Sequence, residues 1–215
     1  TVEPSYGVFP ASLSFGGTEG LNLTVDRFDV DAAKKLLEDA GYQDTDGDGV
    51  IEKGGQPVEI KMIAMSSQTG QVQLCEVLQD QLSQIGIKVN LEVLENISDA
   101  RSSGQFDISC ESYSMAGPGT AQSFISQMFT TDGSSNFGHY SNAEVDALVE
   151  ELSNLEEATG QDDIIRQINQ HIVDDCAYIF FAHKKFAGMY NSDTVKYYWS
   201  QPSEYYILDS STAAK

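Results

Sequence analysis

The chain has 215 residues, of which 40% are hydrophobic, and this is enough to bury the core of a folded protein. Its 33 acidic residues against 12 basic ones give a formal charge of -21, which would repel the phosphates of nucleic acids and anionic membranes. No run approaches the roughly 18 apolar residues of a membrane-spanning helix, and the first residues carry no targeting pattern.

Residues 1–27 are rich in Gly, Ser, Thr and Pro without a hydrophobic period, so they are predicted to be an extended lead-in rather than a packed element. A helix is predicted over 30–40, because Asp29 can cap it, apolar residues recur at helical spacing and Gly41 can end it. Residues 58–65 first alternate and then become fully apolar, as in a strand buried on both faces. There follow a helix at about 69–85, a strand at 87–93, a short helix at 96–102 and a strand at 106–111.

This alternation of strands and helices predicts the α/β class, with a mixed, largely parallel sheet flanked by helices. The second half is more helical, and its last part turns back to short aromatic strands. The predicted helices lie at about 119–130, 142–153 and 161–175, and the predicted strands at 178–183, 186–190, 195–199 and 205–208.

Three cysteines, Cys75, Cys110 and Cys176, each lie among apolar neighbours of a predicted helix or strand. An odd number in such surroundings is typical of buried small hydrophobic residues rather than of a disulfide framework.

The residues from Gln105 to Thr120 run from a buried-strand pattern into a loop of Tyr, Met, Gly and Pro and then into an apolar helix. In α/β sheets, ligands collect outside the carboxyl ends of the strands, where loops can vary on a rigid scaffold. This stretch is therefore predicted to contain a ligand-contacting loop.

An acidic segment at 44–52 places carboxylates at the first, third and fifth positions of a calcium-type loop and Gly at the sixth. The twelfth position is Gly55, whereas a complete loop has a bidentate Glu there. The alternative is a bare acidic turn, since Asp-Gly occurs twice. The candidate calcium ligands are Asp44, Asp46, Asp48, Val50 and Glu52.

Catalysis has little support in the sequence. No Gly-x-Ser-x-Gly elbow is present, and His171 and His183 are expected to be packing or surface residues. His139, in a loop between helices, is kept as a candidate contact to a ligand or metal. Carboxylate pairs such as Asp174–Asp175 or Glu150–Glu151 could serve a glycosidase, but in so acidic a chain a solvated helix face explains them equally.

Several segments together resemble one family. Asp29 to Tyr42, followed by Asp-Thr-Asp-Gly-Asp-Gly-Val at 44–50, resembles its long segment DPEKAKKLLAEAGY-DTDGDGV. Further matches follow in the family's order: the helix-to-strand unit at 78–89, which contains Ile-Gly-Ile at 85–87, then Gly-x-Phe-Asp at 104–107, and Tyr-Ser-Asn-x-Glu-Val-Asp-Ala-Leu at 140–148. The chain thus resembles the extracellular solute-binding proteins, family 5, of peptide- and nickel-type ABC transporters.

The resemblance implies a periplasmic-binding-protein-like, non-enzymatic protein whose two lobes close on a solute. Residues 1–27 would lead in from the missing lobe, 28–185 would form the α/β C-terminal ligand-binding lobe, and 186–215 returning strands and a tail. The solute would be a peptide, a nickel chelate or a related small molecule, and the partner an ABC permease. The protein would act at the extracellular or periplasmic side, with a lipid anchor outside this chain, and the missing initiator Met fits a mature piece.

In this family the loop after the Phe-Asp strand faces the cleft, so the resemblance implies that Tyr113 flanks the ligand. The adjacent wall would be formed by Ser114, Met115, Ala116, Gly117, Pro118 and Gly119. Two other functions stay open from the residues themselves: a carbohydrate-active hydrolase, and a calcium-stabilised interaction module built around 44–52.

Overall fold

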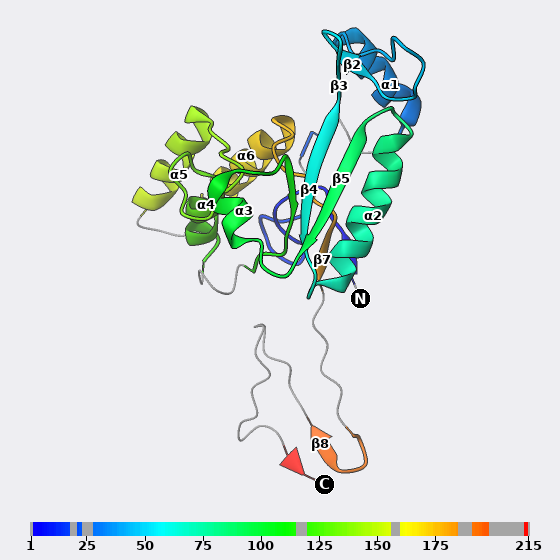
Figure 1. Cartoon of the computed structure of the whole chain (residues 1–215). Coiled ribbons are helices and arrows are strands. Elements are labelled where there is room, and N and C mark those ends of the chain that lie inside the picture. Colours follow the sequence, from blue (N-terminus) through cyan, green and yellow to red (C-terminus); the bar gives the residue numbers. More distant parts are fainter. Residues whose placement is uncertain are drawn as a thin grey trace. The chain divides into compact units, whose positions relative to one another are not determined.

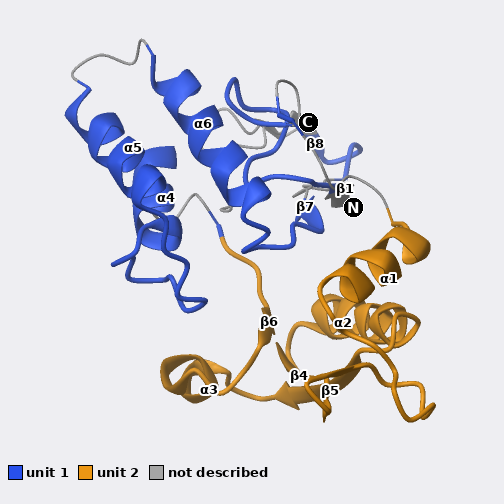
Figure 2. Cartoon of the chain, turned by 90° about the horizontal axis from the view of Figure 1, so that it is seen from above, with its two compact units in different colours: residues 1–26, 114–215 blue, residues 27–113 orange. Residues whose placement is uncertain are grey.

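Two units, each with its own hydrophobic core, make up the chain in the computed structural model (Figures 1 and 2). One consists of residues 27–113, and the other of residues 1–26 and 114–215. The structure describes residues 2–17, 21–22, 28–114, 120–155, 160–184, 191–197 and 213–214. Within these ranges no helix has both the length and the apolar character needed to cross a membrane.

The first unit is an α/β sheet structure. Its three strands, β4 (Glu59–Met65), β5 (Lys88–Leu94) and β6 (Ile108–Cys110), are parallel and lie in the order β5-β4-β6. Helix α2 (Thr69–Ser83) connects β4 to β5 and packs on both, and α3 (Ser98–Ser103) connects β5 to β6 (Figure 1). The predicted α/β fold with a parallel sheet and flanking helices is confirmed.

Local signals explain the boundaries of these elements. Helix α1 (Val30–Asp39) begins where the Asp29 carboxylate accepts a hydrogen bond from the Ala32 amide at 2.9 Å. After α2 the chain reverses at Gly86, whose φ is +83°, and a Cβ there would lie 2.7 Å from the Ile51 side chain. Only glycine satisfies both the left-handed backbone and this close approach, which gives the Ile-Gly-Ile segment a structural reason.

The core of this unit lies between α2 and the sheet. Its fully enclosed residues come from the middle of β4, from α2 and from the ends of the neighbouring strands, as the solidly apolar second half of 58–65 predicts. They are Met62, Ala64, Cys75, Ile87, Val89 and Cys110. The acidic segment before β4 contains a small hairpin of β2 (Glu52–Lys53) and β3 (Gln56–Pro57).

The second unit is built on three helices, α4 (Ala121–Phe129), α5 (Ala143–Asn154) and α6 (Gln161–Asp174), all close to their predicted positions. Apolar faces of all three meet in one core, in which Ile125, Val145 and Ile168 are completely buried. Two antiparallel strand pairs are also present: β1 (Val2–Pro4) with β7 (Ala182–Lys184), and β8 (Val195–Tyr197) with β9 (Ala213–Ala214).

The prediction that residues 1–27 do not pack was wrong for their described part. Val8 and Phe9 are buried in the helical core, and the Val8 amide donates to the Asn169 side-chain oxygen at 3.0 Å. Phe9 also contacts Phe15 edge to face, with ring centroids 5.1 Å apart. A segment without any period can pack when isolated apolar side chains fill gaps between helices, and periodicity cannot report this.

The predicted strand at 178–183 is shorter than expected, because β7 starts at Ala182. Tyr178 instead packs its ring against Phe129 at 5.0 Å between centroids and donates its hydroxyl hydrogen to the Met128 carbonyl at 3.1 Å. Tyr178 therefore packs in the helical core rather than in a sheet. The predicted strand at 195–199 is seen as β8, while 186–190 and 205–208 lie outside the described residues.

Two of the three cysteines are buried as predicted, but Cys176 is exposed. It follows the end of α6 with a φ of 51°, in a turn rather than in an apolar face, so the prediction for this residue was wrong.

We expect a thiol reagent such as Ellman's reagent to react rapidly with Cys176 in the native protein and with Cys75 and Cys110 only after unfolding. Burial, reinforced by the neighbouring Cys110, raises the pKa of Cys75 to about 12, so its reactive thiolate is scarce at neutral pH. A Cys176→Ser variant should lose the rapid phase, and rapid reaction persisting in that variant would contradict the assignment.

The Tyr-Ser-Asn segment at 140–142 ties α5 to the end of α6. Asp175 accepts hydrogen bonds from the Tyr140 hydroxyl at 2.6 Å and the Asn142 amide at 2.7 Å, and the Asn142 side-chain oxygen also caps α5. The bond from Tyr140 and then that from Asn142 lower the pKa of Asp175. The Tyr-Ser-Asn part of the family resemblance therefore has a structural role, because its side chains connect the start of α5 to the end of α6.

Because its pKa is lowered on folding, Asp175 stabilises the protein above the carboxyl's unfolded pKa, at about 4, and this stability is lost as pH falls through the folded value. We expect Asp175→Asn to lower the urea midpoint at neutral pH and to flatten its decline on acidification. The neighbouring Asp174→Asn is the control. Equal acid sensitivity of wild type and Asp175→Asn would refute the linkage.

Candidate functional site

A pocket of about 340 Å³ opens where the three parallel strands of the first unit end. Its residues come from three places: the end of β4 with the start of α2, the turn from β5 into α3 with the helix itself, and the segment after β6. They are Met65, Gln68, Gln71, Asn96, Ile97, Ser98, Arg101, Glu111, Ser112 and Tyr113.

The strand order explains why a pocket forms here. From the central strand β4 the chain crosses to β5 on one side and then returns through α3 to β6 on the other side. The connections after β4 and after β6 therefore diverge at their carboxyl ends, and such a switch point leaves a crevice in which α/β proteins bind ligands.

Two of the lining residues form an ion pair. The Arg101 Nη1 donates to the Glu111 carboxylate at 2.7 Å, and the two side chains are only 21% and 14% exposed. The same nitrogen also donates to the Tyr113 hydroxyl at 3.2 Å. Helix α3 and the end of β6 are thereby joined, and the Tyr113 phenol is held against the pair.

Tyr113 is 43% exposed, and its hydroxyl stays protonated. Burial raises the pKa of this hydroxyl, and the negative charge of Glu111 raises it further. Tyr113 therefore offers a ligand an accessible aromatic surface while its polar end is fixed by neighbours.

A second polar contact joins two residues that line the pocket. Gln71, which is buried, donates from its side-chain amide to the Ser112 hydroxyl at 2.7 Å, so α2 holds the residue before Tyr113. The main chain after β6 is thus positioned from both α2 and α3.

Of the residues predicted to contact a ligand, Tyr113 lies in this pocket, as the position after β6 implies. Ser114 follows it and is half-buried, and 115–119 lie outside the described residues. His139 is exposed in a loop of the other unit, with a φ of 54°. His139 is not among the residues that line this pocket.

Sequence reasoning missed Gln68, Gln71, Arg101 and Glu111. The signal that would have found Gln68 and Glu111 is their position within three residues of the carboxyl ends of two parallel strands, which is the reasoning that pointed to the loop after β6. Arg101 carries no such signal, because its approach to Glu111 depends on how α3 lies against β6.

The acidic loop at 44–52 brings candidate ligands together. Oxygen atoms of Asp44, Asp46, Asp48 and Glu52 all lie within 4.8 Å of one another. Glu52 is buried and accepts from the Thr45 amide at 2.7 Å, and Asp44 accepts from the amides of Gly47 and Gly49. These bonds show that the carboxylates themselves support the turn.

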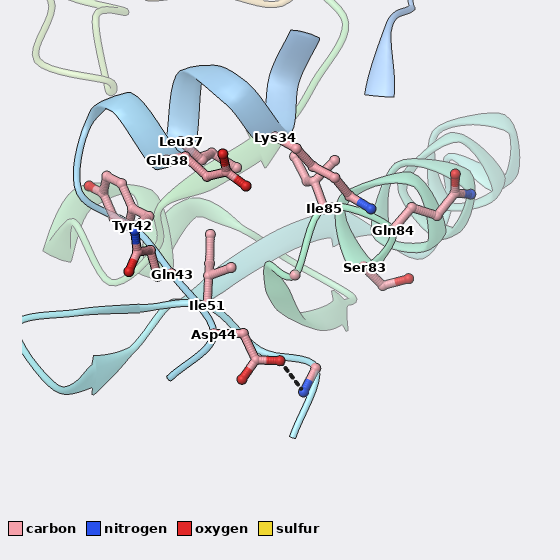
Figure 3. Close-up of a pocket in the computed structure, with 12 residues that line it drawn as sticks. Lys34, Leu37, Glu38, Tyr42, Gln43, Asp44, Ile51, Ser83, Gln84 and Ile85 are labelled. Atoms are coloured by element: carbon pink, nitrogen blue, oxygen red, sulfur yellow. Dashed lines mark hydrogen bonds between the residues drawn. The ribbon is translucent and has the colours of Figure 1, made fainter. Parts of the chain in front are cut away.

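Beside this loop is a second hollow, of about 470 Å³, between α1 and the turn that follows α2 (Figure 3). Figure 3 shows Asp44 at its edge, bonded to the Gly49 amide, with Tyr42 and Lys34 on the side of α1. It lies near the amino ends of the strands, away from the switch point.

The other candidate chemical groups have structural partners. His171 Nε2 lies 3.5 Å from a Glu144 carboxylate oxygen, and His183 lies in β7 with its Nε2 2.7 Å from the Ser5 hydroxyl. Of the carboxylate pairs, Asp175 is bonded to Tyr140, and Glu150 and Glu151 are exposed on α5. Neither pair lines either pocket described here.

The chain is similar to solute-binding proteins of several bacteria. It is 25% identical over 173 residues to the oligopeptide-binding protein AppA of Bacillus subtilis (strain 168), covering 78% of this chain and 32% of AppA. It is 23% identical over 184 residues to the nickel-binding protein NikA of Staphylococcus aureus (strain NCTC 8325 / PS 47), covering 85% of this chain and 35% of NikA. The chain thus spans about a third of the length of these relatives.

Solved structures share its fold. AppA from Bacillus subtilis in complex with a nonapeptide matches with a TM-score of 0.73 at 22% identity, over 85% of this chain and 36% of that one. NikA from Staphylococcus aureus in complex with Ni(L-His)2 matches with a TM-score of 0.74 at 20% identity, over 100% and 43%. A mannohexaose-bound oligopeptide-binding protein of Thermotoga maritima matches with a TM-score of 0.74 at 22% identity, over 86% and 36%.

The family model for bacterial extracellular solute-binding proteins, family 5 (middle), matches residues 1–136, more than half of the chain. This range includes the whole parallel sheet and every residue of the pocket at its carboxyl ends. The chain belongs to the bacterial extracellular solute-binding proteins of family 5.

Proposed function

We propose that this chain captures a small solute for an ABC importer, as the C-terminal lobe of a protein whose two lobes close around the ligand. The observation that carries the proposal is the pocket at the carboxyl ends of β4, β5 and β6, with Tyr113 on its wall, in a member of an extracellular solute-binding family. Capture by burial and closure needs such a rigid wall and no catalytic group.

Binding rather than catalysis is favoured by the chemistry of the pocket. Its described acid, Glu111, is held by Arg101 at 2.7 Å and by the Ser109 hydroxyl at 2.6 Å, an arrangement that fixes a wall. A hydrolase would need a carboxylate free to exchange a proton or attack a substrate.

The solute that we propose is a peptide, a nickel chelate or a related small molecule, the classes named for AppA and NikA. The residues that line the described pocket include no imidazole and no thiol. A nickel ion would therefore have to enter with ligands of its own rather than be bound by this wall.

The partner that we propose is an ABC permease, reached on the extracellular or periplasmic side. Family membership supports this location.

The test measures binding to the full chain by saturation-transfer NMR. This method suits the weak binding expected of a single wall of a cleft. Short peptides, a nickel–histidine complex and oligosaccharides are the probes. Tyr113→Ala should weaken the binding of any active probe roughly tenfold, since it removes the aromatic surface. Tyr6→Ala, which removes an exposed Tyr of the other unit, should leave it unchanged. No binding by any probe would contradict the proposal.

We propose further that the acidic loop holds a structural calcium ion through Asp44, Asp46, Asp48 and Glu52, with Val50 contributing its carbonyl. Hard cations prefer such oxygen ligands, and the closeness of the four carboxylates supports the assignment. At calcium a hundred times its Kd, the protein should gain about 2.7 kcal/mol of stability. Asp46→Asn should lose this gain and Asp132→Asn should keep it; an unchanged melting temperature in millimolar calcium would refute the site.

A further inference from the structure

We infer that the pocket at the carboxyl ends of the sheet receives an uncharged, hydrogen-bonding part of the solute, rather than a free ammonium or carboxylate group. The inference rests on the proposed function and specifies the chemistry of its ligand. Among the ten residues that line the pocket, one is basic, Arg101, and one is acidic, Glu111.

These two charges are matched to each other. Arg101 and Glu111 form their bond at 2.7 Å with little exposure, and the other Glu111 oxygen accepts from the Ser109 hydroxyl at 2.6 Å. An incoming ammonium would have to displace a guanidinium from a largely buried carboxylate, and an incoming carboxylate would compete with Glu111 itself. Either exchange leaves a poorly solvated charge, so a charged ligand group gains little here.

The remaining polar groups of the pocket are neutral. Tyr113 keeps its hydroxyl proton, because burial and then the charge of Glu111 raise its pKa. Gln68, Asn96 and Ser98 also line the pocket. Amides and hydroxyls both donate and accept, so they match a ligand that also does both.

Apolar side chains also line the pocket. Met65, Ile97 and the exposed Tyr113 ring line the same pocket. Neutral hydrogen-bonding groups next to an aromatic face suit the main-chain amides of a peptide's interior or the hydroxyls of an oligosaccharide.

The test compares three probes of similar size on the full chain by saturation-transfer NMR: trialanine with charged ends, N-acetyl-trialanine amide and mannotriose. We expect at least one uncharged probe to bind about tenfold more tightly than trialanine. If that probe is N-acetyl-trialanine amide, the pocket recognises main-chain amides; if it is mannotriose, the pocket recognises sugar hydroxyls. Trialanine binding as tightly as both uncharged probes, or more tightly, would overturn the inference. No binding by any of the three would count against the proposed function, and with it the inference.

A variant tests the role of the ion pair. Glu111→Gln leaves the Arg101 charge unmatched, so N-acetyl-trialanine, which keeps only its carboxylate, should bind about tenfold more tightly than it binds wild type. Glu59→Gln removes an exposed acid from the opposite end of β4 and should change nothing. An unchanged affinity in a folded Glu111→Gln protein would overturn the inference. If circular dichroism shows that this variant is unfolded, the wild-type comparison decides by itself.

Discussion

Replacing Ile168 by alanine is expected to lower the free energy of unfolding of the helical unit by about 3 kcal/mol. Ile168 is 0% exposed at the point where α4, α5 and α6 meet, together with residues of the N-terminal segment. Removing three carbon atoms there costs their transfer from water and leaves a cavity that rigid neighbours cannot fill. Urea unfolding followed by circular dichroism measures the change.

The matched control is Ile179→Ala, the same substitution at a side chain that is 60% exposed in the same unit. It should change the unfolding free energy by less than about 0.5 kcal/mol. Similar losses at both positions would show that the helical core is not organised around Ile168.

Replacing Arg101 by methionine is expected to destabilise the α/β unit by about 2 kcal/mol, although methionine retains much of the apolar volume. The substitution leaves the Glu111 carboxylate, which is 14% exposed, without its guanidinium partner. The loss measures the cost of a poorly hydrated charge, which is larger than the net value of the pair itself. Thermal and urea unfolding both report it.

A second ion pair of the same unit provides the control. Lys88 and Glu59 also meet at 2.7 Å, but their side chains are 51% and 43% exposed. Lys88→Met should therefore have almost no effect, since water replaces the lost partner. An equal effect of the two substitutions would contradict the importance of burial at the Arg101–Glu111 pair.

The order and type of the main elements could be predicted from local patterns. Helix α1 was predictable because Asp29 and Gly41 mark its ends, and β4 because a fully apolar run is typical of a strand covered on both faces. The position of Tyr113 in a pocket at the carboxyl ends of the strands could be anticipated in the same way, since this residue comes shortly after a parallel strand. These features depend on neighbours in the sequence.

The composition of the pocket was less predictable. Gln71, Arg101 and Glu111 come from different elements and act through contacts with one another and with Ser112 and Tyr113. The spacing of these residues along the chain does not predict such contacts, because the contacts depend on how α2 and α3 are placed on the sheet.

Local patterns were enough to identify the α/β class, most of the helices and strands and the family to which the chain belongs, because caps, periods and turns act between residues close in the chain. Three features emerge only in the folded chain: residues 8 and 9 enter the helical core, Tyr178 packs on helices rather than in a strand, and the pocket's two charges neutralise each other. Burial and ion pairing depend on distances in space, and residues that are remote in the chain create them.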